Sequence, residues 1–412
     1  MMRTVSNIVV FYGGFLRAMF GGTISPMDES KLNWRPRLRP LQMTLQDGAL
    51  VLSDPLGLSP NPVSLSPAAA VVLGLMDGKR TLGEIAEEYS KIVGERVGPA
   101  EILTLIEKLD ELYLLDSPRF EEAYRKATED FLRRDSRPYT MAGLSYPADP
   151  MALREKVAAA RRLDSSGRDL TARGVVIPHI DPRRGWPVYV EGLRAIFRNP
   201  ADLIVILGVA HSPIRHPVQV LPMALETPLG RLEVADDVVS KLTGSVSYDL
   251  VSDPLAFVRE HSVEFPAVFV KALFPERRLR VVPLIVSDLG DGPEAIDEAM
   301  IKLREILRGR EFLPVAAVDL SHVGPKFGDE FLDEDRMLHY DGEFMASFST
   351  GVPESLKALY EEMGNPTRID AYGATYALMR LIEGEEGESL AYDVSREDET
   401  SSAVSFMAGV IR

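Results

Sequence analysis

The sequence predicts an α/β protein in which a three-layer α/β/α sandwich follows a smaller N-terminal domain. In residues 138–412, short apolar segments rich in Val and Ile alternate with segments of helical periodicity. Three of the apolar segments, residues 174–179, 203–211 and 314–322, each end in a histidine. These segments are too short and too β-branched for helices, so we expect buried strands of a parallel or mixed sheet.

The three histidines are His179, His211 and His322. The carboxyl ends of parallel strands meet at one edge of a sheet, where open α/β sheets place their ligands. Neutral imidazole is the commonest metal ligand in proteins. The pattern therefore predicts a metal site, although a lone histidine in such a place more often caps a helix or completes a loop.

Asp319 precedes His322 by three residues and could orient an imidazole. If His322 is not a ligand, its pKa range suits a general acid or base beside the metal. The alternative is that Asp319 and Ser321 only cap the segment that follows.

A second polar cluster, residues 260–264, opens an apolar helix. His261 and Glu264 lie one helical turn apart and can bind a substrate or a second ion. Capping by Glu260 and Ser262 explains the cluster about as well. We expect His216 and His339 to lie at the surface.

Composition limits the functions that the chain can have. Its 412 residues carry a net charge of −16, which argues against a nucleic-acid or anionic-membrane surface. The absence of cysteine excludes disulfides and thiolate ligands. The apolar stretch at 8–20 is too short to span a bilayer, so we expect a cytoplasmic protein.

The N-terminal part predicts a winged helix. Strands at 43–45 and 49–52 flank an Asp47-Gly48 turn, and helices begin near Ser66, Thr81 and Pro99. The expected organisation is a flexible extension at 1–36, the winged helix at 37–118, a helical connector at 119–137 and the α/β domain at 138–412.

The segment 37–118 resembles the PqqD-like family on its hairpin, its Asp77-Gly78 turn and the run Thr81-Leu82-Gly83-Glu84-Ile85-Ala86. Such domains bind a peptide, often for a radical-enzyme partner. The resemblance implies a peptide ligand for this domain rather than DNA.

Residues 138–412 resemble the Memo family, whose motifs occur in order. They are Ala142-Gly143 with Tyr146-Pro147-Ala148-Asp149, Pro178-His179, Gly208-Val209-Ala210-His211, Glu226-Thr227-Pro228-Leu229-Gly230, residues 260–264, residues 319–324 and Asp370-Ala371-Tyr372-Gly373. The family is similar in fold to the class III extradiol dioxygenases, which use non-haem iron. Microbial members are called AmmeMemoRadiSam system protein B, which implies a radical SAM protein and an AMMECR1-like companion as partners.

The resemblance also implies roles for individual residues. It makes His179 and His211 metal ligands and His322 the active-site imidazole, assisted by Asp319. We place His261, Glu264 and Asp181 among the substrate-binding residues.

The third ligand is where the sequence departs from the family. A cysteine is usual before the glycine of the last motif, and Tyr372 stands there. A phenolate can ligate ferric iron, but with a pKa near 10 it is a poor ligand for divalent ions; Asp181, Asp319 or His322 could complete the site instead. Iron is the expected metal, with copper or zinc as alternatives, although the missing thiolate argues against Cu(I).

Three functions remain possible on the sequence alone. The leading hypothesis is a dioxygenase-like oxidoreductase with a mononuclear iron site, acting on an unidentified small molecule or peptide. The alternatives are a non-enzymatic protein that binds a peptide or ligand, and a metal-dependent hydrolase, since a zinc-bound water with a nearby base needs no further residues.

Overall fold

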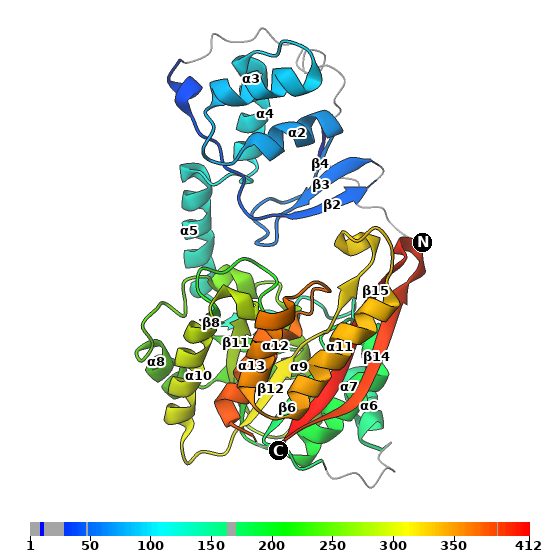
Figure 1. The fold of residues 1–412 in the computed structure, drawn as a ribbon. Coiled ribbons are helices and arrows are strands. Elements are labelled where there is room, and N and C mark those ends of the chain that lie inside the picture. Colours follow the sequence, from blue (N-terminus) through cyan, green and yellow to red (C-terminus); the bar gives the residue numbers. More distant parts are fainter. Residues whose placement is uncertain (1–8, 12–28, 47, 163–169, 385) are drawn as a thin grey trace. The chain divides into compact units, whose positions relative to one another are not determined.

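The computed structural model describes residues 9–11, 29–46, 48–162, 170–384 and 386–412 and forms two compact units, Met1–Phe131 and Leu132–Arg412 (Figure 1). Most of the extension predicted at 1–36, and Asp47 of the predicted hairpin turn, lie outside the described residues.

In its described residues, the N-terminal unit contains a small sheet and four α-helices. The sheet has the order β1-β4-β3-β2, and β3 runs antiparallel to both β2 and β4. Its described strands and α-helices are β1 (Val9–Phe11), β2 (Gln42–Gln46), β3 (Ala49–Ser53), β4 (Val63–Leu65), α2 (Pro67–Leu75), α3 (Leu82–Val93), α4 (Pro99–Glu111) and α5 (Pro118–Leu132).

The predicted helix starts of this unit are present. Ser66 caps α2, and Thr81 and Glu84 form a reciprocal capping box at the start of α3. The apolar residues of α4, among them Ile102 and Leu109, are fully buried in one core with α2, α3 and the sheet. The segment therefore folds around its own hydrophobic core.

The C-terminal unit is built on a mixed sheet of eleven strands. The main path has the order β13-β15-β6-β12-β7-β11-β10-β9-β5, with β14 paired to β15 and β8 paired to β11. The strands are β5 (Ser136–Arg137), β6 (Gly174–Ile177), β7 (Leu203–Val209), β8 (Val218–Val220), β9 (Ala224–Thr227), β10 (Gly230–Val234), β11 (Arg280–Val286), β12 (Leu313–Ala317), β13 (His322–Val323), β14 (Gly387–Glu397) and β15 (Ser402–Ile411).

The three strands predicted to end in histidines are neighbours in this sheet. β12 lies between β6 and β7 and is parallel to both, with Val315 opposite Val175 and Ile206. Their carboxyl ends therefore reach one edge together, as the sequence predicts. This arrangement is what brings residues more than 100 positions apart into one site.

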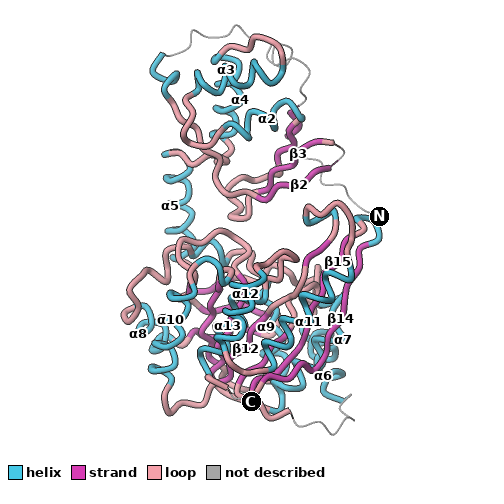
Figure 2. The backbone as a smooth tube through the Cα atoms, viewed as in Figure 1, coloured by secondary structure: helices cyan, strands magenta, loops and turns pink. Residues whose placement is uncertain are grey.

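Helices cover both faces of the sheet, as Figures 1 and 2 show. Along β7, Leu203, Val205 and Leu207 share a core with α10 and α13, and the alternating Ile204 and Ile206 face the opposite layer. The helices are α6 (Pro150–Arg162), α7 (Pro182–Arg198), α8 (Asp236–Thr243), α9 (His261–Leu273), α10 (Pro293–Leu307), α11 (Glu334–Ser349), α12 (Pro353–Met363) and α13 (Ala371–Ile382). The predicted fold class, a large sheet flanked by helices, is confirmed.

Some elements differ from the prediction. The sequence predicts a helix from Val188 to Phe197 here, but α7 already begins at Pro182, because the Asp181 carboxylate caps it and Pro182 occupies the first turn. The strand β14 and the helices α8 and α12 were not predicted. Among the described residues, no helix is both long and apolar enough to cross a bilayer.

Candidate metal centre

The side chains of His179, His211 and His322 each have one ring nitrogen fixed by a hydrogen-bond acceptor. The Nδ1 of His179 lies 2.9 Å from the carbonyl oxygen of Ala317, and the Nδ1 of His211 lies 2.9 Å from Glu260 Oε1. Because these oxygens only accept, each Nδ1 must carry a proton. The Nε2 atom of each ring is therefore the one available to bind a metal.

His322 is held in the same way. Its Nδ1 donates to the carbonyl oxygens of Leu320 and Arg368, at 3.0 and 3.1 Å. All three imidazoles, which follow three different strands, therefore carry a proton on Nδ1.

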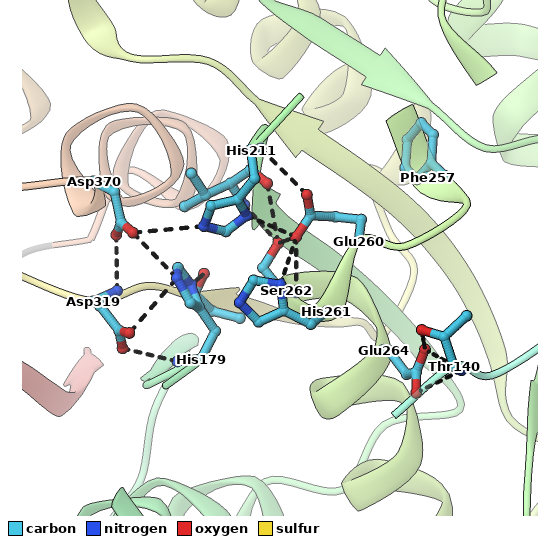
Figure 3. Close-up of polar contacts among 12 residues, drawn as sticks. Thr140, His179, His211, Phe257, Glu260, His261, Ser262, Glu264, Asp319 and Asp370 are labelled. Atoms are coloured by element: carbon cyan, nitrogen blue, oxygen red, sulfur yellow. Dashed lines mark hydrogen bonds and ion pairs between the residues drawn. The ribbon is translucent and has the colours of Figure 1, made fainter. Parts of the chain in front are cut away.

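The three Nε2 atoms converge on the carboxylate of Asp370. Figure 3 shows this carboxylate facing His179 and His211. Asp370 Oδ2 lies 3.1 Å from His179 Nε2, 3.8 Å from His211 Nε2 and 3.9 Å from His322 Nε2. The other oxygen, Oδ1, accepts the backbone N–H of Asp319 at 2.9 Å, which fixes the orientation of the carboxylate.

The charges of this cluster require a cation or protons. The carboxylates of Glu260 and Asp319 are each only 3% exposed, and within the described residues their ion pairs and those of Asp370 are with histidines. Buried charges are stable only when they are compensated. The donor set, imidazole nitrogen with carboxylate oxygen, fits a divalent metal ion that would replace the protons on Nε2.

The electrostatics agree with this interpretation. Burial lowers the pKa of His179, but the carboxylates of Asp319 and Asp370 outweigh it and raise that pKa to about 9. Burial opposes the charged form of His211 too, yet Glu260 and Asp370 raise its pKa well above the ordinary value. In metal-free protein, protons therefore take the place of a cation.

His261 completes the group of imidazoles. His179, His211 and His261 each offer one nitrogen, and these nitrogens lie within 4.8 Å of one another, a spacing that can hold a metal ion. The rings of His211 and His261 stack at 4.6 Å with 28° between their planes. Burial and the neighbouring His211 lower the pKa of His261 to about 3, so this ring is neutral at pH 7.

Asp319 lies in the cluster but acts mainly on the backbone. Its Oδ1 accepts the N–H groups of His179 and Ile180, at 3.1 and 3.0 Å. Its Oδ2 is 3.7 Å from His179 Nε2. Asp319 therefore fixes the turn that carries the first histidine.

The partners of Glu264 do not fit the substrate-binding role predicted for it. It is 1% exposed and forms an ion pair with Arg137 at 2.7 Å. It also accepts hydrogen bonds from the backbone of Thr140 and Met141 and from the Tyr146 hydroxyl. With its oxygens occupied in the interior, Glu264 is a structural residue rather than a substrate ligand, and we correct that prediction.

The surroundings of Asp181 and Tyr372 also differ from those that their predicted roles require. Asp181 caps α7, and the described hydrogen bonds of its carboxylate are with Arg183 and Ser145. Tyr372 is buried in the core, edge-on to Phe344 and Tyr360, with ring centroids at 5.2 and 5.1 Å. Its position does not support the predicted ligand role, which the geometry transfers to Asp370 or His261.

Sequence reasoning therefore missed two residues, Asp370 and Glu260. Asp370 opens the motif that contains Tyr372, so the sequence signal lay two positions before the predicted ligand. Glu260 was interpreted as a helix cap. It does cap α9 by accepting the N–H of Ser262, but the same oxygen also accepts from His211.

A sandwich with histidines and a carboxylate at the carboxyl edge of its strands defines an α/β protein with a candidate mononuclear metal centre. Residues 137–410 match the family model described as Memo-like protein. The chain belongs to the Memo family.

Two curated relatives are similar over nearly their whole length. A MEMO1 family protein of Aquifex aeolicus is 34% identical over 92% of this chain and 99% of its own. A MEMO1 family protein of Thermus thermophilus is 37% identical over 80% and 98%. The Aquifex alignment extends well beyond residues 137–410, so it also includes most of the N-terminal unit.

A solved structure of an uncharacterized protein from Escherichia coli K12 is also similar. It is 16% identical, with a TM-score of 0.40, and the match covers 58% of this chain and all of that one.

Proposed function

We propose that this protein binds one iron ion through His179 Nε2, His211 Nε2 and Asp370 Oδ2 and uses it in a redox or oxygen-dependent reaction. The observation that carries the proposal is the convergence of these atoms on one point, with each Nδ1 of the two histidines already engaged. Two histidines and one carboxylate form the facial triad of non-haem iron oxygenases.

The ring geometry favours Asp370 over His261 as the third ligand. A ring nitrogen directs its lone pair within the ring plane. The stacked rings of His211 and His261 therefore direct their lone pairs side by side rather than toward one point. Asp370 Oδ2, in contrast, faces both His179 and His211.

In this proposal iron supplies Lewis-acid and redox chemistry, and the chain supplies positioning and proton transfer. His322 presents Nε2 toward Asp370 while its Nδ1 is held by two carbonyl groups. It can accept or release a proton at Nε2 without turning. The side chains of His211, His261 and His322 are partly exposed, so a substrate can reach this edge.

The substrate is a small molecule or a peptide, and the proposed partners are a radical SAM protein and an AMMECR1-like protein. The support for these partners is the resemblance, together with an N-terminal unit that the Aquifex relative shares. Co-purification with each candidate companion tests this part of the proposal.

The test of the metal site is anaerobic purification followed by metal analysis. We expect about one iron per chain, loss of the iron in the double variant His179→Ala, His211→Ala, and oxygen uptake only by loaded protein. Protein that contains zinc and takes up no oxygen would favour a metal-dependent hydrolase. Protein that binds peptide but no metal would favour the non-enzymatic alternative.

A further inference from the structure

Arg137 lies outside the histidine cluster but is attached to the helix that supports it. It belongs to β5, and only 1% of the residue is exposed. Its Nε donates to the carbonyl oxygen of Phe257 at 2.8 Å, and its Nη2 donates to the carbonyl oxygen of Glu260 at 3.0 Å. The Nη1 atom pairs with Glu264 at 2.7 Å. The guanidinium group thus contacts three residues of the segment 257–264.

Glu260 connects this attachment to the metal centre. The carbonyl oxygen of Glu260 accepts from Arg137. Its carboxylate accepts two hydrogen bonds from His211, one from Nδ1 at 2.9 Å and one from the backbone N–H at 3.2 Å. Any shift of the Glu260 backbone would therefore move the carboxylate that sets the tautomer and orientation of His211 (Figure 3).

The remaining contacts hold Arg137 and Glu264 in place. Glu264 also accepts the N–H groups of Thr140 and Met141 and the hydroxyl of Tyr146. A guanidinium presents five N–H donors in a fixed planar arrangement, which lets this one side chain bond two carbonyl oxygens and a carboxylate at once. Lysine at this position would retain the positive charge but lack the planar set of N–H donors.

We propose that Arg137 is a positioning residue for His211, acting through Glu260. The inference rests on the proposed function, since it assigns Arg137 to the second sphere of that metal site. It predicts that loosening Arg137 impairs the metal centre itself, beyond any loss of stability.

The chain offers a matched control in the other unit. Arg39 and Asp54 form a buried ion pair at 2.7 Å, with side chains 4% and 0% exposed. The Nε of Arg39 also donates to a carbonyl oxygen, that of Tyr113. The Arg39→Lys variant therefore also removes guanidinium contacts to a buried carboxylate and a carbonyl oxygen. Arg39 is far from the histidines in sequence and belongs to the N-terminal unit, which has its own hydrophobic core.

The experiment compares Arg137→Lys with Arg39→Lys in the full chain, with Co²⁺ alone as the probe. We expect the Kd for Co²⁺ to rise about 10–100-fold in Arg137→Lys, the usual effect of losing a partner of a metal ligand. In Arg39→Lys it should stay within about twofold of wild type, because no ligand partner is lost. Equal Kd values in the two variants would overturn the proposal.

A second readout needs no metal. In metal-free wild type, ¹⁵N–¹H NMR correlations of the histidine rings should show His211 with a proton held on Nδ1, and in Arg137→Lys that signal should shift or broaden. An unchanged His211 signal contradicts the proposal. If wild type binds no Co²⁺, the proposed function fails, and the NMR comparison still decides the role of Arg137.

Discussion

The carboxylate of Asp370 is the residue on which the metal assignment depends. It faces three imidazole nitrogens within 3.9 Å, and within the described residues its ion pairs are with these histidines. Tyr372, two positions later, belongs to the hydrophobic core. A helix start turns side chains two positions apart in different directions, so the sequence motif alone could not decide between them.

Replacing Asp370 by Asn should abolish tight metal binding. The amide keeps the shape of the side chain but removes the negative charge between His179 and His211, so the loss should exceed the roughly 10–100-fold typical of second-sphere changes. Iron content after anaerobic purification measures it. The exposed Asp393→Asn on β14 is the control and should keep its iron; an Asp370→Asn protein with full iron would contradict the assignment.

Tyr372→Phe should retain the metal. The phenol ring packs against Phe344 and Tyr360, and phenylalanine preserves that packing. Metal content and the visible spectrum of the ferric protein provide the measurement. Loss of iron together with a tyrosinate band in wild type would restore Tyr372 as a ligand.

At the scale of elements, a close approach between α13 and the end of β11 places Asp370. A Cβ atom on Gly373 would lie 1.8 Å from the carbonyl oxygen of Ser287, so only glycine fits there. Gly373 is therefore the reason that the start of α13, and Asp370 before it, reach the edge of the sheet.

Gly373→Ala should displace the start of α13. Overpacking typically costs about 1–3 kcal/mol, and here the clash is with backbone, so we expect lower stability together with weaker metal binding. Gly342→Ala in α11 is the matched control because its Cβ meets nothing within 4 Å. Thermal unfolding and Co²⁺ titration measure both variants; unchanged metal affinity in Gly373→Ala would contradict this role.

Elements with strong local signals could be predicted from the sequence. The strands at 174–177, 203–209 and 313–317 and the capped helices α2 and α3 have apolar runs or capping residues that define them locally. The strand β14 could not be predicted from its own residues, because its alternating polar residues are stabilised by pairing along the whole of β15. Likewise, Glu260 and Asp370 gain their roles only through tertiary contacts with histidines 48 to 191 positions away.

At the scale of the whole molecule, metal binding should be linked to pH and to the stability of one unit. Binding at pH 7 should release protons. The pKa of His179, raised to about 9 by Asp319 and Asp370 against the effect of burial, keeps that ring protonated below pH 9. The metal must displace this proton, so the apparent affinity should increase as the pH rises toward about 9. Calorimetric titration in buffers of different ionisation enthalpy counts the released protons; binding with no proton release would contradict the charged state of the metal-free site.

Saturating metal should stabilise the C-terminal unit selectively. A ligand at 100 times its Kd contributes about 2.7 kcal/mol. Since the histidines all lie in Leu132–Arg412, the N-terminal unit should unfold at an unchanged temperature. Differential scanning calorimetry with and without Co²⁺ tests this, with His179→Ala, His211→Ala as the variant that should show no shift.

Anomalous X-ray diffraction at the iron edge tests the central claim most directly. Crystals of the anaerobically loaded protein should show one anomalous peak per chain, bonded at about 2.0–2.2 Å to His179 Nε2, His211 Nε2 and Asp370 Oδ2. A peak bonded to Tyr372 or to His261 in place of Asp370, or no peak among these histidines in protein that contains iron, would contradict it.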